Sequence, residues 1–599
     1  MASLINALDK QKQIGENGHA EYGWTAKTES SSFTDSSIQE SIVQLSFQLV
    51  RGKGGGLSTK FKDILQVLSC NIKQDETAIR REIDSSYYLN IICKLIAQTR
   101  DIVDGKGEYT LSYMLVYELY QFFPKEAEQV LTRFFHLSLI KDGSVVHPYG
   151  SWKDVKYFCK YVLDVPTKGN KQIGKFAINL MLEQLQKDEQ KDEQKDETGT
   201  ISLAAKWCPR EKCARFGAFF SVMATTYFKQ YLVSAITPEQ KKRATTKCLM
   251  EFRKLLSRLN KKLDTIQIKQ CDEKWADINH AKTTSITGMK QRKVLLNVDK
   301  KGNARSFSED RITCAENYQE HLASLKKNGK EVKGKRIGLN DFTVQALALN
   351  NQPCNESTTL EKDILNSQWR DNATGTSDLG QIVALVDVSG SMEGDPLHAA
   401  IALGIRVAEK SAIGKRVLTF SEFGNWHDLS SCATFTESVA SLKTADWGTT
   451  TNFYAAFNNI LDAIVTGKLT HEQVEGMILV IFSDMQMNTA LLPRRGINVE
   501  EDNSNKDTRV LYEVMTAKYA KAGMKLWGKP FSPPHILFWN LRQTTGFPVL
   551  TEQPNVTMFS GFSPALLNQF CNKGIEGLKN VNPWSQLVES LNNDRYIHL

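Results

Sequence analysis

Asp387, Ser389 and Ser391 are the residues whose types and spacing most clearly suggest chemistry. They stand at alternate positions, with Gly390 between the serines, directly after the apolar run Ile382–Val386. A short apolar run rich in β-branched residues predicts a strand that is buried on both faces, as in a parallel sheet. A carboxylate and two hydroxyls are hard oxygen donors, and ligands of open α/β sheets bind where parallel strands end. We therefore expect a site for Mg²⁺, or for Mn²⁺ or Ca²⁺.

Two segments further along the chain extend this pattern. Asp-x-Ser-x-Ser after an apolar strand resembles the first signature of the von Willebrand A domain, whose metal-ion-dependent adhesion site also needs a Thr and an Asp on separate loops. Gly448–Phe453 resembles the Thr loop, in which Thr451 fits best, and Asp484 after the apolar run Met477–Phe482 resembles the last ligand. The resemblance thus implies a site of five residues: Asp387, Ser389, Ser391, Thr451 and Asp484.

Helix capping is a second interpretation of the first two residues of this motif. Asp387 and Ser389 could cap a helix that we expect to begin near Pro396. Capping would require neither the Thr loop nor the second apolar run. Three pieces in the right order over roughly a hundred residues favour the metal site.

Composition limits the class of protein. The chain has 599 residues, of which 41% are apolar, so we expect three or four domain-sized units with substantial cores. No stretch approaches the roughly 18 apolar residues of a membrane span, and the first residues do not read as a signal peptide. The 11 cysteines show no CxxC pattern, which argues against a disulfide framework or a zinc site. We expect a cytoplasmic protein without membrane contact, or a virion protein if the source is a giant virus.

Charge is unevenly distributed along the chain. The formal net charge is +8, yet residues 201–350 contain 30 Lys and Arg against 14 Asp and Glu. Such a bias suggests a basic face for an acidic partner, nucleic acid included, and a solvated lysine-rich helix surface is the equal alternative. The expected helix Pro238–Leu263 holds most candidates, which we place on several helix faces. The candidate nucleic-acid contacts are Arg243, Lys247, Arg253, Lys254, Arg258, Lys261 and Lys262.

Periodicity predicts a multidomain chain with three parts. Residues 1–35 are polar and predict an extended or disordered lead-in. Residues 36–370 show apolar residues at helical spacing and predict an all-α region of stacked helix pairs, solenoid or ring-like, with a low-complexity KDEQ repeat at 187–198 as an exposed loop or helix extension. Residues 371–599 alternate strands with helices, which predicts an α/β doubly wound sheet, and the resemblance described above implies that this sheet is of the von Willebrand A type.

Right-handed crossovers would bring the three metal-binding loops to one edge of this sheet. The expected strands are 381–387, 416–421, 477–484 and 535–540, and the expected helices are 396–411, 436–442, 453–465, 508–522 and 564–570.

A glycine-rich basic segment, Arg51–Gly56, stands apart from these elements. Its backbone N–H groups could contact phosphate, but it lacks the Gly-Lys-Ser/Thr ending of a P-loop. We interpret it as a connector.

Several longer strings of the sequence are distinctive: ENG at 16–18, RDIVDGKGE at 100–108, ISLAAKWCP at 201–209, the segment 252–262, VALVDVSGSM at 383–392, FSDM at 482–485 and FWNLR at 538–542. Together they resemble one family, the uncharacterised intracellular family known from plants, fungi and giant viruses and described only as a domain of unknown function. The layout is also similar to that of the Ro autoantigen, in which helical (TROVE) repeats close into a ring that binds RNA and a von Willebrand A domain closes the ring.

These observations predict a monomeric, non-enzymatic binding scaffold whose metal ion captures an acidic protein ligand. RNA binding by the basic helical region is the alternative. A metal-dependent phosphoesterase is disfavoured, because two-metal hydrolases need ligand sets for ions about 4 Å apart and usually a general base. The chain offers one such set, and His398, His427 and His471 lie in no recognisable motif.

Overall fold

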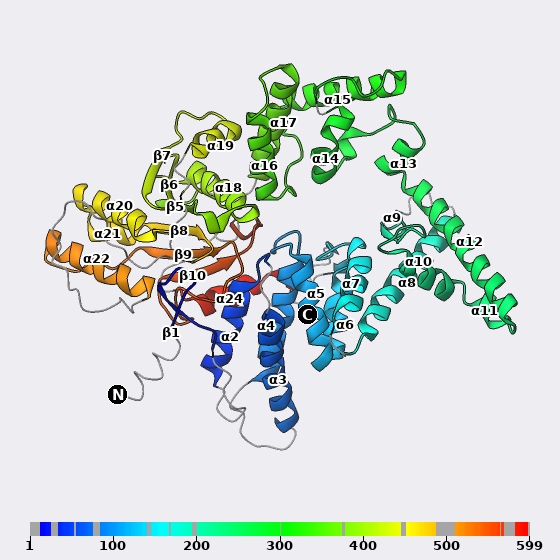
Figure 1. The fold of residues 1–599 in the computed structure, drawn as a ribbon, viewed down its shortest axis with the longest axis horizontal. Helices are drawn as coiled ribbons and strands as arrows, with labels where there is room; N and C mark the ends of the chain where they lie inside the picture. Colours follow the sequence, from blue (N-terminus) through cyan, green and yellow to red (C-terminus); the bar gives the residue numbers. More distant parts are fainter. Residues whose placement is uncertain are drawn as a thin grey trace. The chain divides into compact units, whose positions relative to one another are not determined.

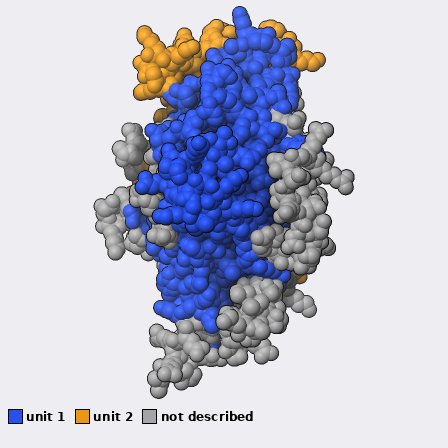
Figure 2. Space-filling model, turned by 90° about the vertical axis from the view of Figure 1, so that its left-hand side faces the viewer, with its two compact units in different colours: residues 1–95, 104–106, 331–597 blue, residues 96–103, 107–330, 598–599 orange. Residues whose placement is uncertain are grey.

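The chain forms two compact units, which Figure 2 distinguishes by colour, and Figure 1 labels their helices and strands. Unit 1 comprises residues 1–95, 104–106 and 331–597, and unit 2 comprises residues 96–103, 107–330 and 598–599, so the division falls within helix α4 (Ser85–Arg100). The computed structural model describes residues 12–25, 34–52, 56–75, 84–139, 145–166, 169–194, 200–299, 301–373, 378–444, 448, 451–486, 510–563, 565–567 and 581–596.

Unit 2 is helical and carries the basic region. Its one small sheet among the described residues pairs β3 with β4. The elements are α5 (Tyr109–Phe122), α6 (Pro124–Arg133), β3 (Ser138–Leu139), β4 (Val145–Val146), α7 (Lys153–Asp164), α8 (Gln172–Glu193), α9 (Ala204–Trp207), α10 (Gly217–Tyr227), α11 (Gln230–Val233), α12 (Pro238–Leu263), α13 (Ile266–Cys271), η1 (His280–Lys282), α14 (Ser285–Leu295) and α15 (Glu309–Lys327).

Unit 1 is built on a mixed six-stranded sheet. The strand order is β10-β9-β8-β5-β6-β7, with β7 antiparallel and the other strands parallel. All six residues of β5, β8 and β9 are buried, as expected of strands covered on both faces. The strands are β5 (Ile382–Asp387), β6 (Arg416–Phe420), β7 (Gly424–Asp428), β8 (Ile478–Ser483), β9 (His535–Asn540) and β10 (Val556–Ser560).

Helices cover both faces of this sheet. Leu385 packs into the core formed with helices α20 and α22. On the other face, helix α18 approaches β5 closely: a Cβ on Gly404 would lie 2.5 Å from Val386 Cγ2. Successive strand residues point to opposite faces, so both faces contribute to one layered core. The helices are α18 (Asp395–Lys410), α19 (Phe435–Lys443), α20 (Phe453–Thr466), α21 (His471–Glu475) and α22 (Leu511–Trp527), with η2 (Gly390–Met392) after β5.

Segments distant in sequence complete unit 1. Tyr22 and Phe547 exchange two backbone hydrogen bonds of 2.9 Å, and Phe47 of α2 lies in the core beside Phe547. Trp369 of α17 stacks on Phe435 of α19 with ring centroids 3.9 Å apart. The elements are β1 (Lys12–Ile14), β2 (Ala20–Tyr22), α2 (Asp35–Gln48), α3 (Leu57–Asp75), α16 (Leu339–Asn350), α17 (Glu356–Asn372), α24 (Pro583–Leu591) and η4 (Asp594–Tyr596).

The structure confirms a multidomain chain with a helical N-terminal region and a C-terminal α/β sheet. The solenoid or ring and the von Willebrand A identity of the sheet domain stay predictions. The contacts group α2, α3, α16 and α17 with the sheet, so the units differ from the predicted division at residues 36–370 and 371–599. The described part of the predicted lead-in forms the hairpin β1–β2. Within the described helices, none combines the length and the apolar character needed to cross a bilayer.

Several elements differ from their predicted form. Strands β7 and β10 and helix α21 were not predicted, and α22 ends at Trp527 rather than at residue 522. Of the two forms expected for the KDEQ repeat at 187–198, the helix extension is present as far as Glu193, the last residue of α8. Of the predicted helix 564–570, residues 565–567 are helical and the others lie outside the described residues.

Candidate functional site

Asp387 lies at the carboxyl end of β5, between strands β6 and β8. Numbered in chain order, the six strands run 6-5-4-1-2-3, so β5 and β8 meet where the strand order reverses. Ligands of open α/β sheets bind at such a switch point. The Asp387 carboxylate is fully buried and accepts hydrogen bonds from Ser389 N at 2.9 Å and from Ser483 Oγ at 2.6 Å. Ser389 Oγ and Ser391 Oγ are 3.1 Å apart.

Asp484 follows the last residue of β8 and is also fully buried. Its Oδ1 accepts a hydrogen bond from Gln486 N at 3.1 Å, and its Oδ2 accepts one from Arg542 Nη1 at 2.9 Å. The intervening Met485 has φ 63°, a left-handed conformation that a side-chain-bearing residue adopts at a cost. Asp484 is thus held by a strained turn and by a cation from the neighbouring strand.

The two carboxylates influence each other electrostatically. Burial, followed by repulsion from Asp484, raises the pKa of Asp387 to about 7, while the hydrogen bonds from Ser389 and Ser483 oppose this shift. Two buried carboxylates in mutual repulsion form a site that a cation would stabilise. Among the described residues, no group of three or more His, Cys, Asp or Glu is arranged so that it could hold a metal ion, and the donors gathered here are two carboxylates and hydroxyls.

Thr451 lies just before helix α20 and is 1% exposed. Its neighbour Asn452 donates its backbone N–H to Ser421 O at 2.6 Å and its Nδ2 to Glu422 O at 3.2 Å, which ties the loop to the end of β6. Asn452 also caps α20 by accepting from Ala455 N. Because β6 is adjacent to β5, Thr451 lies at the same edge of the sheet as Asp387.

The five predicted metal ligands differ in exposure. Asp387 and Asp484 are fully buried, Ser389 and Thr451 are at most 2% exposed, and Ser391 is intermediate. Access from solvent among these five is therefore greatest at Ser391. The oxygen donor set fits a hard divalent cation, for which neither nitrogen nor sulfur ligands are needed.

Sequence reasoning missed the residues that support this site. Ser483 holds Asp387, and Arg542 pairs with Asp484 and lies 3.7 Å from Glu16. Glu16 N and Asn17 Nδ2 donate to the Gln486 side chain and backbone, both at 2.8 Å. Arg542 could have been found, because it follows β9, the parallel neighbour of β8. The strings ENG, FSDM and FWNLR therefore meet at one place.

The predicted nucleic-acid contacts lie on α12 in unit 2. Five of the seven candidates follow one another at spacings of 4, 7, 4 and 3 residues. Because an α-helix has 3.6 residues per turn, these five lie on one exposed face of α12. We had expected the candidates to be spread over several faces. Arg253 and Lys262 lie off this face. We call the shared face the α12 stripe: Arg243, Lys247, Lys254, Arg258 and Lys261.

Acidic residues already pair with part of this basic set. Arg258 lies 2.8 Å from Glu189 and 3.0 Å from Asp192, both in the KDEQ repeat of α8. Four of the seven side chains take part in ion pairs, and two of these four, Arg258 and Lys262, pair with the repeat, which thus partly neutralises α12. The four are Arg253, Lys254, Arg258 and Lys262.

Comparisons with known proteins agree with a family of unknown function. Residues 381–594 match the family described as Domain of unknown function (DUF7788), and residues 175–310 match Domain of unknown function (DUF2828). The chain is similar to the uncharacterized protein L728 of Acanthamoeba polyphaga mimivirus, with 29% identity over 523 residues that cover 84% of this chain and 79% of that protein. The first match coincides with the sheet that carries Asp387 and Asp484.

Proposed function

We propose that unit 1 is a metal-dependent binding module of the von Willebrand A type that captures an acidic protein ligand. Asp387, Ser389, Ser391, Thr451 and Asp484 would hold a divalent cation, which supplies a positive centre for a carboxylate. The observation that carries this proposal is the pair of fully buried, mutually repelling carboxylates at the switch point of the sheet. Arg542 offsets the charge of Asp484, whereas the hydrogen-bond donors to Asp387 are neutral, so a further cation would stabilise the pair.

Arg542 has a defined part in this proposal. Its guanidinium lies 2.9 Å from Asp484 and offsets the charge of that carboxylate. A divalent cation bound at the same carboxylate would repel Arg542 and compete with it. The exposed side of Ser391 is then the direction from which a ligand carboxylate can approach.

Binding is favoured over hydrolysis by the donor set. Two-metal hydrolysis requires a second group of ligands about 4 Å from the first ion and usually a general base. Within the described part of unit 1, the hydrogen-bond partners of Asp387 and Asp484 are serine, glutamine and arginine groups. These groups position carboxylates, and none of them is a base at neutral pH.

The test is calorimetric titration with Mg²⁺ and Mn²⁺, followed by capture of ligands with and without EDTA. D387A should abolish saturable metal binding and EDTA-sensitive capture. E393Q is the matched control, because Glu393 is an exposed carboxylate two residues beyond Ser391. Equal metal affinity in D387A and the parent protein, or capture that EDTA leaves unchanged, would contradict the proposal.

RNA binding by unit 2 is a second candidate, and the α12 stripe is the observation that favours it. Five exposed cations on one helix face suit a phosphate backbone, and Lys247 also lies 4.1 Å from the Tyr231 ring centre. The test is filter binding of single-stranded RNA at several salt concentrations, which gives the slope of log affinity against log salt concentration. Each phosphate contact contributes about 0.7 to the magnitude of this slope, so the variant R243Q/K247Q/K254Q/K261Q should lower that magnitude by about 3. K242Q/R253Q, which changes two cations off the stripe, is the control. An unchanged slope in the stripe variant would exclude this candidate.

A further inference from the structure

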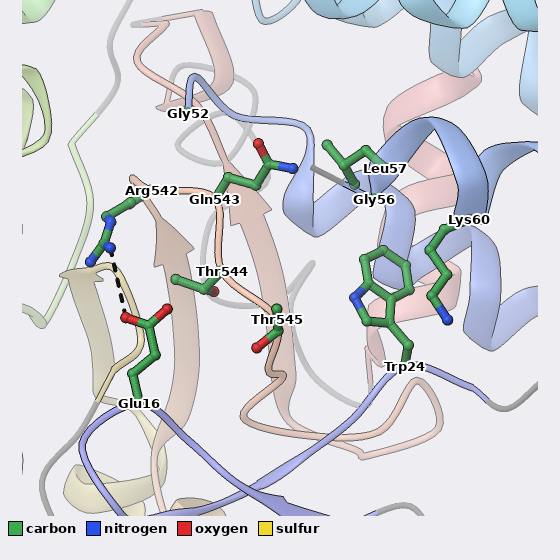
Figure 3. A pocket seen from close by; sticks show the side chains of 10 residues that line it. All are labelled: Glu16, Trp24, Gly52, Gly56, Leu57, Lys60, Arg542, Gln543, Thr544 and Thr545. Carbon is green, nitrogen blue, oxygen red and sulfur yellow. Dashed lines mark ion pairs between the residues drawn. The ribbon is translucent and has the colours of Figure 1, made fainter. Parts of the chain in front are cut away.

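Unit 1 contains a cavity of about 530 Å³ beside the candidate metal site (Figure 3). Its walls come from the N-terminal hairpin, the segment before α3, the first turn of α3 and the loop after β9. The lining residues are Glu16, Trp24, Gly52, Gly56, Leu57, Lys60, Arg542, Gln543, Thr544 and Thr545. A volume of this order suits a small organic ligand.

The cavity wall is held in place by close backbone packing. A Cβ on Gly52 would lie 2.7 Å from Gln543 Cβ, so only glycine allows this approach. Thr544 N, in the same loop as Gln543, donates to Gln48 Oε1 at 2.7 Å, which fixes this loop against α2. The cavity is therefore formed before any ligand arrives, which reduces the entropy lost on binding.

The two cations that line the cavity, Arg542 and Lys60, differ in their ion-pair partners. Arg542 lies 2.9 Å from Asp484 and 3.7 Å from Glu16, so two carboxylates already share its charge. Lys60 lies with its Nζ 5.6 Å from the Trp24 ring centre, and no carboxylate among the described residues forms an ion pair with it. Lys60 is thus the cation whose charge remains available to an anion.

Trp24 supplies a flat surface in the same cavity. Its indole meets Phe547 edge-on, with ring centroids 5.1 Å apart and planes at 87°, so its orientation is fixed. Figure 3 shows Trp24 beside Lys60, with Gln543, Thr544 and Thr545 between this pair and Arg542. A planar group can stack on such a ring, and base–aromatic stacking contributes about 1–3 kcal/mol in other proteins.

We propose that this cavity binds a small organic anion containing a planar ring, with the ring against Trp24 and the phosphate or carboxylate near Lys60. A ring without charge would leave Lys60 unused, and an inorganic ion would leave Trp24 unused. Two lining glycines, Gly52 and Gly56, belong to the segment Arg51–Gly56, which was interpreted as a connector. The structure gives its ends a place in the wall of a ligand site.

The test is calorimetric titration in EDTA, so that its result does not depend on metal binding. The probes are AMP and benzoate for the two kinds of anion, with adenosine and inorganic phosphate as the separated parts. At least one of AMP and benzoate should bind saturably and more tightly than either separated part. K60Q should weaken this binding about tenfold or more, and W24L should weaken it while leaving phosphate binding unchanged.

K62Q is the matched control, because Lys62 lies on the same helix but does not line the cavity. Its affinities should equal those of the parent protein. Lys60 is partly exposed, so K60Q tests the site even if W24L lowers stability. Absence of saturable binding by both AMP and benzoate, or equal binding in the parent protein and K60Q, would overturn the proposal.

Discussion

At the scale of single residues, the electrostatics of the candidate site depend on which groups offset its two buried carboxylates. Asp387 has two neutral donors, Ser389 N and Ser483 Oγ, whereas Asp484 has Arg542. Neutral donors reduce the cost of a buried charge but do not cancel it. Arg542 thus neutralises one of the two buried charges, and the other is offset only by neutral groups.

The variant R542Q should show separately how Arg542 affects the stability of the fold and the affinity for Mg²⁺. Without the guanidinium, Asp484 is buried without a cationic partner, so the free energy of unfolding in EDTA should fall by about 1–2 kcal/mol. This is less than for a fully buried pair, because 35% of the Arg542 side chain is exposed. Mg²⁺ affinity should rise about tenfold, because the competing cation is gone. Urea unfolding and calorimetry measure the two quantities.

R416Q is the control for this experiment, since Arg416 and Asp428 form an ion pair with both side chains about half exposed. It should change neither quantity measurably. Weaker Mg²⁺ binding in R542Q would show that Arg542 supports the metal rather than competes with it.

A second prediction at this scale concerns Glu21 in the N-terminal hairpin. Glu21 is 2% exposed, and burial raises its pKa to about 7, with a hydrogen bond from Gln13 opposing and the charge of Glu16 adding to the shift. Because the folded pKa lies above the unfolded value, the folded state binds the proton more tightly. Stability is then full at low pH and falls as pH rises toward about 7, by at most about 3 kcal/mol.

E21Q should remove this pH dependence. His19 Nε2 lies 3.7 Å from Glu21 Oε2, and a protonated His19 would reduce the effect. Urea unfolding at pH 5 and pH 8 should show that the parent protein loses more stability than E21Q over this interval. Parallel pH profiles for the two proteins would contradict the assignment.

At the scale of elements, the position of Asp387 depends on the packing of α18 against β5. G404A would place a Cβ 2.5 Å from Val386 Cγ2, and a β-branched side chain in a sheet core cannot move away cheaply. We expect the free energy of unfolding to fall by about 1–3 kcal/mol. V386A in the same chain should restore part of this loss.

G174A is the matched control, since the nearest side-chain atom to its Cβ would be 3.5 Å away on Val162. It should be neutral or slightly stabilising, because alanine favours a helix over glycine. Thermal unfolding compares the three variants. A G404A protein as stable as G174A would show that α18 is not held tightly against β5.

Sequence periodicity predicted the central strands well and the peripheral ones poorly. Strands β5, β8 and β9 each contain an apolar run of four or five residues because both faces are covered, so their composition identifies them. Strand β7 reads Gly-Asn-Trp-His-Asp, without an apolar run, and it forms by pairing with β6 at the sheet edge. The hairpin β1–β2 likewise depends on its bonds to Phe547, more than 500 residues away.

The residues of the candidate site also differ in how far the sequence could indicate them. Asp387, Ser389 and Asp484 lie at or just after the ends of apolar strands, so the resemblance to the von Willebrand A signature was enough to select them as candidates. Ser483 and Arg542 act through contacts between strands that are distant in sequence, and only the strand order places them together. We did not predict the α12 stripe, because we considered all basic residues of the helix together. The spacing of the five stripe residues alone follows the 3.6-residue period of an α-helix.

At the scale of the whole molecule, the two proposed activities lie in different units. The sheet site belongs to unit 1 and the α12 stripe to unit 2. A ligand that binds only the folded form stabilises the part that it contacts. Metal binding and RNA binding should therefore leave separate signatures along the chain.

Hydrogen exchange with mass spectrometry should show this separation. Mg²⁺ should slow exchange in peptides at the ends of β5 and β8, and should leave peptides from α8 and α12 unchanged. D387A should abolish the effect. Equal protection in α12 on adding Mg²⁺ would contradict the assignment of the metal to the sheet.

The most direct measurement is an anomalous difference map from a crystal of the protein soaked in Mn²⁺. The account predicts one peak bound by oxygens of Asp387 and Asp484, with Arg542 no longer paired to Asp484. A map without a peak at these carboxylates, with the Arg542–Asp484 ion pair intact at saturating Mn²⁺, would contradict it.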